Sequence, residues 1–264
     1  MHKAWTVPLC ALLCLTACSV PIQLLGQAND VASIRGSLAK PDGPGPFPAV
    51  ILMHGCDGLS PMSLRRAQHW AHFYRRLGYV TLITDSFTPR GWYGCRNRDP
   101  KSRITVTHRV VDAYSALAFL AAQPFVDKDR VVLEGMSHGG TSVLNALAVD
   151  DPTGQHGKFA AGIAFYPRCV YFLDLVNLQA PLLVLVGDQD GTTPAEPCHP
   201  PAHVQAPFEY RLKVYAGATH AYDVDSPGGR YFQGDYREFH PQATADSATQ
   251  IQQFLATHVP AASR

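Results

Sequence analysis

Short apolar runs alternate with amphipathic stretches along most of the chain. The apolar runs are five or six residues long and are bounded by Gly, Pro or Asp, which is typical of buried parallel strands. They cover residues 49–53, 79–84, 130–134, 160–165, 182–186 and 210–214. Helical spacing of apolar residues predicts helices over 62–77, 104–122, 139–149 and 243–258. This alternation predicts an α/β fold: a mainly parallel twisted sheet with helices on both faces.

One predicted strand runs directly into a glycine-rich turn that contains a serine. The run 131–134 is followed by Gly135-Met136-Ser137-His138-Gly139 and then by a helical stretch. The order strand, G-x-S-x-G, helix is the nucleophile elbow of the α/β-hydrolase fold, where a sharp turn exposes the serine oxygen above the sheet. The flanking glycines are needed because the turn leaves no room for side chains. Ser137 is therefore the predicted nucleophile.

A serine hydroxyl needs a base, and in this fold the chain order is Ser, acid, His. The strand 210–214 is followed by a glycine-containing turn that ends at His220, the predicted base. The strand 182–186 is followed by Gly187-Asp188-Gln189-Asp190, so either aspartate lies in the expected loop. We favour Asp190 as the acid and expect Asp188 to accept backbone N–H groups in the turn.

Acyl transfer also needs two N–H donors for the developing oxyanion. One is the backbone N–H of His138, directly after the serine. The other comes from the loop after the first predicted strand, His54-Gly55-Cys56-Asp57-Gly58, where we assign Cys56 and keep Asp57 as the alternative. This mechanism requires no metal and no organic cofactor.

Together these motifs resemble the dienelactone hydrolase family over about residues 49–255. The resemblance also includes Asp85-Ser86-Phe87 with Arg90-Gly91. In that family the acid is the last residue of the Gly-x-x-Asp motif, which supports Asp190. Members that open dienelactones have a cysteine nucleophile and a carboxylate-binding arginine four residues after the histidine. This chain has Ser137 and Val224 there, so the resemblance implies a carboxylic-ester hydrolase.

The loop after strand 79–84 is the predicted substrate loop. Arg90 resembles the family's other carboxylate-binding arginine. Arg90, Trp92 and Tyr93 follow a strand end on the catalytic edge, so we expect them to line the substrate site.

The first residues have the pattern of an export signal. His2 and Lys3 precede an apolar run, residues 4–17, that is short for a bilayer span and typical of a signal peptide. The end of residues 1–18 resembles the lipobox of bacterial lipoproteins, with Cys18 as the lipid-bearing residue; cleavage near Cys18 or after Ala28 without lipid is the alternative. We expect a tether over 19–32, a single domain over 33–264, and a place in the bacterial envelope or periplasm.

Four cysteines would remain in the mature chain besides Cys18. Because an oxidising compartment favours disulfides and no CxxC pair occurs, we expect two bridges and no metal site. Cys56 and Cys95 lie in loops after neighbouring strands, as do Cys169 and Cys198. The predicted pairs are Cys56–Cys95 and Cys169–Cys198.

Composition narrows the choice of partners. The chain has 264 residues, 46% of them apolar and 16% charged, with a net charge of +1. No basic stripe is long enough to follow a phosphate backbone, so nucleic acid is not an expected partner. The sequence predicts an enzyme acting on a small ester, with membrane contact only through Cys18. A peptidase or amidase of the same fold, and a non-catalytic envelope binding protein, are the alternatives.

Overall fold

The computed structural model describes residues 18–23, 33–92, 94–95, 104–155, 157–170, 173–225, 228–232 and 234–261. Within them, an eight-stranded sheet has the order β1-β2-β4-β3-β5-β6-β7-β8, and β9 and β10 form a separate hairpin. The strands are β1 (Cys18–Gln23), β2 (Ser33–Ala39), β3 (Phe47–Met53), β4 (Val80–Asp85), β5 (Val126–Met136), β6 (Ala161–Phe165), β7 (Leu182–Gly187), β8 (Tyr210–Tyr215), β9 (Arg230–Phe232) and β10 (Asp235–Arg237). From β4 to β8 the neighbours are parallel, whereas β1 and β2 run antiparallel at one edge.

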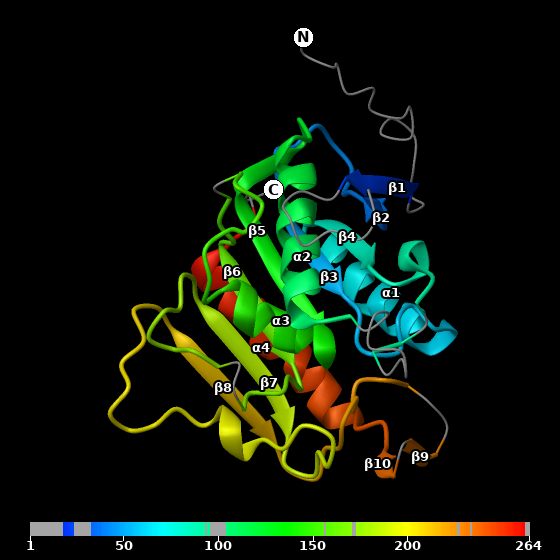
Figure 1. Ribbon diagram of the computed structural model, residues 1–264, viewed down its shortest axis with the longest axis vertical. Coiled ribbons are helices and arrows are strands. Elements are labelled where there is room, and N and C mark those ends of the chain that lie inside the picture. Colours follow the sequence, from blue (N-terminus) through cyan, green and yellow to red (C-terminus); the bar gives the residue numbers. More distant parts are fainter. Residues whose placement is uncertain are drawn as a thin grey trace.

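Helices cover both faces of the sheet (Figure 1). They are α1 (Pro61–Arg76), α2 (Val106–Ala121), α3 (His138–Ala146) and α4 (Pro241–His258), with short 3-10 turns η2 (Thr88–Arg90) and η4 (Glu196–Cys198). Alternate strand residues point to opposite faces, so Val50 and Leu52 join one apolar cluster with α1 and α4, and Ala49 and Ile51 join the other with α2 and α3. No helix in the described part of the chain is long and apolar enough to cross a membrane.

The predicted fold is confirmed, and all six predicted strands and four predicted helices are present with end shifts of a few residues. The sequence did not predict β1, β2 or the β9–β10 hairpin. Residues 19–23 of the expected tether instead belong to β1, which pairs with β2 along its whole length. The expected signal segment, residues 1–17, lies outside the described residues.

The strand order indicates which edge of the sheet holds the ligand site. β3 lies between β4 and β5. The chain therefore adds β4 on one side of β3 and β5, with the later strands, on the other side. In open α/β sheets the ligand site lies beyond the carboxyl ends of the strands where the strand order reverses in this way. The loop after β3 and the elbow after β5 therefore meet at this edge.

Candidate active site

Ser137 stands in a sharp turn between β5 and α3. Its backbone has φ 55° and ψ −116°, a left-handed conformation that side chains rarely adopt. A Cβ on Gly135 would lie 2.2 Å from the carbonyl oxygen of Gly139, and one on Gly139 would lie 2.4 Å from that of Met53. Both positions therefore require glycine, as the elbow motif predicts. The turn leaves Ser137 half-buried at the amino end of α3.

The structure brings Ser137, His220 and Asp190 together in one chain of hydrogen bonds. His220 Nε2 lies 3.0 Å from Ser137 Oγ, and His220 Nδ1 lies 2.7 Å from Asp190 Oδ2. The carboxylate can only accept, so Nδ1 carries the proton and Nε2 is left to accept from the serine hydroxyl. His220 and Asp190 are 2% and 4% exposed, which keeps water from competing for these bonds.

Two threonines after Asp190 fix the orientation of its carboxylate. The backbone N–H groups of Thr192 and Thr193 donate to Oδ1 at 2.9 and 2.7 Å. The Thr193 hydroxyl lies 2.8 Å from Asp190 Oδ2. Asp188 accepts instead from the backbone N–H of Gly217 at 2.8 Å, the turn contact expected for it. The structure thus places Asp190, the aspartate favoured from the sequence, against His220, and Asp188 against the turn.

Tyr166 packs beside the histidine and was not singled out in the sequence. Its ring meets that of His220 edge-on at a centroid distance of 4.8 Å. Its hydroxyl donates to Asp223 at 2.7 Å and accepts from Arg66 at 2.5 Å. Tyr166 follows β6 with φ 36°, so only its place just after a strand could have indicated it.

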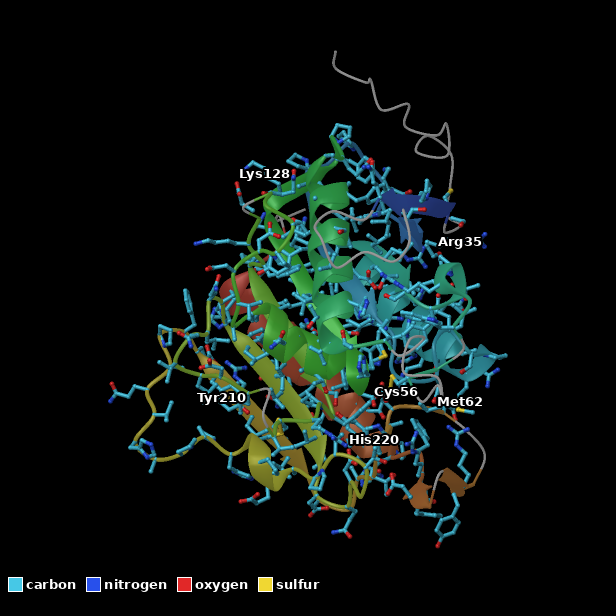
Figure 2. The ribbon with its side chains drawn as sticks, viewed as in Figure 1. Arg35, Cys56, Met62, Lys128, Tyr210 and His220 are labelled. Carbon is cyan, nitrogen blue, oxygen red and sulfur yellow. A yellow bond between two sulfur atoms is a disulfide. The ribbon has the colours of Figure 1, made fainter. Side chains whose placement is uncertain are left out.

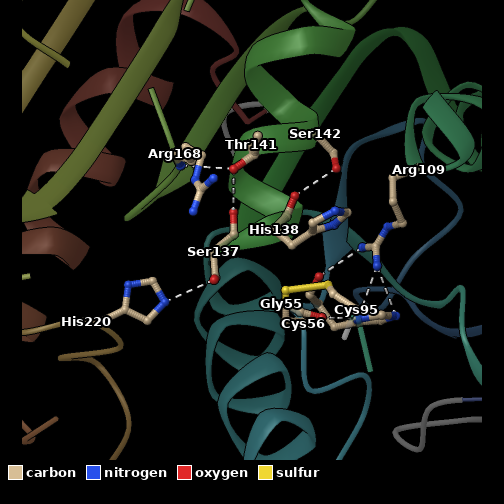
Figure 3. The surroundings of a disulfide bond; sticks show 11 residues. Gly55, Cys56, Cys95, Arg109, Ser137, His138, Thr141, Ser142, Arg168 and His220 are labelled. Atoms are coloured by element: carbon tan, nitrogen blue, oxygen red, sulfur yellow. Dashed lines mark hydrogen bonds between the residues drawn. A yellow bond between two sulfur atoms is a disulfide. The ribbon is translucent and has the colours of Figure 1, made fainter. Parts of the chain in front are cut away.

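The loop after β3 lies against Ser137, as Figure 3 shows. A Cβ on Gly55 would lie 3.2 Å from Ser137 Cβ, so glycine permits this close approach. Cys56 is joined to Cys95 by a disulfide, and the Cys95 N–H donates to the Cys56 carbonyl at 3.0 Å. The loop expected to supply an oxyanion donor is therefore held by both a covalent and a backbone bond.

Arg109 also holds this loop, and no local sequence pattern indicated it. This buried side chain of α2 donates from Nη2 to the carbonyl of His54 at 2.9 Å, and its Nη1 lies 3.2–3.3 Å from the His54 ring nitrogens. Burial, and then the charge of Arg109, hold the pKa of His54 well below its usual value. The neutral ring donates from Nδ1 to the Gly55 carbonyl at 2.8 Å and accepts at Nε2 from the Ser86 N–H at 3.2 Å.

Burial lowers the pKa of two further groups on this side. The pKa of Arg109 falls to about 10, which still leaves it charged at neutral pH. Burial, with Arg109 second, lowers the pKa of His138 to about 3, so this side chain is neutral as well. One buried cation and two neutral imidazoles therefore lie next to the loop and the elbow that carry the expected oxyanion donors, a setting that favours negative charge there.

A pocket opens beside Ser137. Figure 2 shows that Cys56, Met62 and His220 lie at the same end of the molecule, while Lys128 of β5 lies at the opposite end. The described residues that line the pocket come from the β3 loop, α1, the elbow, the acid loop, the histidine turn and the hairpin: Gly55, Cys56, Asp57, Met62, Ser63, Arg66, Ser137, Thr192, His220, Ala221, Val224, Arg230 and Arg237.

The predicted substrate loop is placed differently from expectation. Arg90 is buried and forms a two-pronged ion pair with Asp112 of α2, at 2.9 and 3.1 Å. Trp92 is 7% exposed and packs with Phe87 and Ile104. Neither belongs to the described pocket lining, because both turn into the domain rather than toward Ser137. The expectation that they line the site is corrected; Tyr93 lies outside the described residues.

Both disulfides join the cysteines that were expected to pair. Cys169, after β6, is bonded to Cys198 in the acid loop, with a Cα–Cα distance of 5.1 Å. The Tyr210 hydroxyl also donates to the Cys198 carbonyl at 2.6 Å, which ties this loop to β8. Each bridge thus fixes one of the loops that border Ser137 and Asp190.

A mainly parallel sheet with an elbow serine, a histidine and an aspartate at its carboxyl edge defines the α/β-hydrolase fold. Within this fold the chain belongs to the dienelactone hydrolase family, whose model matches residues 34–259.

Solved structures show the same architecture. A putative dienelactone hydrolase from Klebsiella pneumoniae superposes with a TM-score of 0.68 at 17% identity, covering 92% of this chain and 99% of that one. Esterase 2 of Thermogutta terrifontis with bound propionate gives a TM-score of 0.65 at 18% identity, covering 95% and 97%. At these identities the likeness concerns the fold.

Curated relatives match over shorter stretches. The quorum-quenching protein AidA of Acinetobacter baumannii is 26% identical over 131 residues, which is 50% of this chain and 40% of AidA. The uncharacterized peptidase y4qF of Sinorhizobium fredii is 30% identical over 165 residues, 59% of this chain and 20% of the peptidase. This chain therefore aligns with less than half the length of these relatives.

Proposed function

We propose that this protein is a serine hydrolase that cleaves carboxylic esters through a covalent acyl-enzyme. The observation that carries the proposal is the continuous line of bonds from Ser137 Oγ through His220 to Asp190. Groups spaced in this way form a working nucleophile, base and orienting acid. The strained elbow that presents the hydroxyl above the sheet supports the same assignment.

The proposed reaction has two acyl-transfer steps. His220 Nε2 takes the proton from Ser137 as its oxygen attacks the ester carbonyl, and Asp190 stabilises the imidazolium that forms. The backbone N–H groups of Cys56 and His138 stabilise the oxyanion. The imidazolium then protonates the leaving alcohol. A water molecule then gives a proton to His220 as its oxygen attacks the acyl carbonyl. The bond to Ser137 Oγ breaks, the acid leaves, and His220 returns the proton to Ser137.

Hydrolysis of p-nitrophenyl esters of increasing acyl length tests this proposal. We expect activity in the wild type and its loss in Ser137→Ala. Labelling by a fluorophosphonate should occur on the wild type and be absent from Ser137→Ala. A protein that neither hydrolyses the esters nor reacts with the probe would contradict the proposal and favour the envelope binding protein.

A peptidase or amidase is the second candidate. It is supported by the match to the Sinorhizobium fredii peptidase and by a structural match to the dipeptidyl peptidase 4 of Porphyromonas gingivalis, with a TM-score of 0.60 over 90% of this chain. Aminoacyl p-nitroanilides separate the two functions. Cleavage of an anilide at a rate comparable to the matching ester would favour the peptidase.

We also propose that the protein is exported and carries lipid on Cys18. The two disulfides are consistent with an oxidising compartment. Metabolic labelling with a fatty acid tests the anchor. Label should enter the wild type and be missing from Cys18→Ser, and a released, unlabelled wild type would indicate simple signal cleavage.

A further inference from the structure

Three arginines from distant parts of the chain line the pocket beside Ser137. Arg66 lies on α1, whereas Arg230 and Arg237 lie on the two strands of the β9–β10 hairpin. The same pocket is lined by His220 and by the loop of Cys56. Anything bound against Ser137 therefore lies within reach of these guanidinium groups.

Two of these arginines have a buried N–H group with no acceptor in the described part of the chain. The Nε atoms of Arg66 and Arg230 have no hydrogen-bond partner among the described residues, and Arg66 is only 7% exposed. Leaving a buried donor of a charged group without a hydrogen bond costs free energy. Both side chains line the pocket, so an oxygen anion bound there would supply an acceptor to their guanidinium groups.

The hairpin adds a second, independent sign of anion binding. Arg230 and Arg237 are directly opposite each other in the β9–β10 pairing. Like charges in this position destabilise a strand pair. Burial lowers the pKa of Arg237; Asp57, Asp235 and Asp190 oppose this, while Arg230 adds to it. A bound anion would screen the repulsion between the two cations.

Most of the carboxylates near these arginines lie outside the pocket lining. Asp223 lies 3.6 Å from Arg66 but also accepts from Trp70 and Tyr166. Asp235 lies 3.6 Å from Arg237 and accepts from Thr192. Neither is part of the described lining, in which Asp57 is the one carboxylate. The inner surface of the pocket is therefore predominantly cationic.

Apolar side chains also line the pocket, namely those of Met62, Ala221 and Val224. They suit a short run of methylene groups between a reacting carbonyl and a charged end. Arg90 takes no part, because Asp112 already satisfies its guanidinium.

We propose that Arg66, Arg230 and Arg237 form an anion subsite, and that the preferred substrates are esters with a carboxylate or similar anionic group a few bonds from the scissile carbonyl. This inference rests on the proposed ester hydrolysis at Ser137 for its catalytic part. The anion-binding part can be measured without turnover.

Calorimetric binding to full-length Ser137→Ala protein tests the subsite directly. Monomethyl succinate carries one charge, and dimethyl succinate is its neutral match. We expect the monoester to bind at least about tenfold more tightly, the size of one charge-assisted hydrogen bond. Adding Arg230→Gln or Arg237→Gln should remove most of this preference. Adding Arg65→Gln, on the exposed side of α1, removes the same charge away from the pocket and should keep it.

Hydrolysis then links the subsite to the reaction. Mono-p-nitrophenyl succinate should have a kcat/KM at least about tenfold above that of its methyl ester, and Arg230→Gln should lower this ratio. Equal binding and equal kcat/KM for both members of each pair would overturn the subsite while leaving ester hydrolysis intact. Tight monoester binding without hydrolysis of any ester would instead refute the proposed function and leave the subsite standing.

Discussion

The loop after β3 and the β9–β10 hairpin border the same pocket but are held by different kinds of interaction. The loop is buried at His54, is bonded to Arg109 and is closed by the Cys56–Cys95 disulfide. The hairpin has strands of three residues, and Tyr231 on its outer face is 78% exposed. Its described links to the domain include the contacts of Asp235 and Arg237 with Thr192.

This difference matches two different tasks. An oxyanion donor has to be in place before the reaction, since any displacement reduces transition-state stabilisation. A substrate-selecting element can be added at the surface and altered without disturbing the core. We infer that the loop stabilises the oxyanion that every ester forms, and that the hairpin selects among ester substrates. The predictions below test this division, from the largest expected effect to the smallest.

The acid of the triad should give the largest effect. Asp190→Asn should lower kcat by about 10³-fold or more, because the histidine loses its orienting charge and tautomer. Asp188→Asn is the matched control in the same loop and should change kcat little. Steady-state kinetics on one ester decide the matter. A larger loss in Asp188→Asn would reverse the assignment of the acid.

Opening the bridge in the loop should cost both stability and rate. The chain-entropy estimate for a closed loop of this size gives about 3–4 kcal/mol of unfolding free energy. The double variant Cys56→Ser/Cys95→Ser should therefore unfold at lower denaturant and lose kcat. Cys169→Ser/Cys198→Ser is the control: its loss of stability should be similar. If Cys56→Ser/Cys95→Ser loses this stability but keeps the kcat of the wild type, the first bridge does not preorganise the oxyanion donor.

Arg109 should affect rate more than binding. Arg109→Met keeps the apolar stem but removes the donors to His54, so we expect kcat to fall by about 10- to 100-fold with a smaller change in KM. Arg109→Lys restores the charge and should recover part of kcat. A pure rise in KM would show that Arg109 does not act through the loop.

The buried His54 should make stability depend on pH. Its folded pKa lies below 6.5, so the unfolded chain binds a proton that the native state excludes. Stability is therefore present above about pH 6.5 and falls below it, by up to about 1.4 kcal/mol per pH unit. His138, also neutral in the fold, adds a drop of the same sign.

His54→Asn separates the two histidines. The slope of unfolding free energy against pH between 6.5 and 5 should decrease by about one proton, measured by urea unfolding. His72→Asn, at an exposed position of α1, should leave the slope unchanged. An unchanged slope in His54→Asn would mean that His54 is charged in the fold.

The sequence predicted the parts of the site that depend on local signals. Ser137 and His220 follow strands through glycine-containing turns, and the cysteines lie in loops after neighbouring strands. Contacts between distant residues left no such signal. Arg109 lies 55 positions from His54, and Arg66 lies 100 positions from Tyr166. The three-residue strands of the hairpin are too short to show a period of two.

Arg90 shows why position after a strand is not sufficient. Arg90 lies at the expected edge, but its side chain points toward Asp112 on α2 and not into the pocket. The turn η2, which is followed by Gly91 with φ 67°, sets this orientation. Neither the turn nor the buried partner can be read from residues 79–93 alone. The cationic side chains of the pocket come instead from a helix and a hairpin.

The exposed tyrosines of the hairpin should give the smallest effect. Tyr231 and Tyr236 are opposite each other, with ring centroids 5.4 Å apart, on the face away from the arginines. Tyr231→Ala should change the unfolding free energy by no more than about 0.5–1 kcal/mol, the range for one exposed cross-strand pair. It should nevertheless raise KM for the anionic ester about two- to threefold, since looser strands hold Arg230 and Arg237 less firmly. Phe208→Ala, which removes another exposed ring at 44% exposure, is the control and should leave KM unchanged. A fall in kcat with constant KM would place the hairpin in the chemistry, and the division between a catalytic loop and a selecting hairpin would then be wrong.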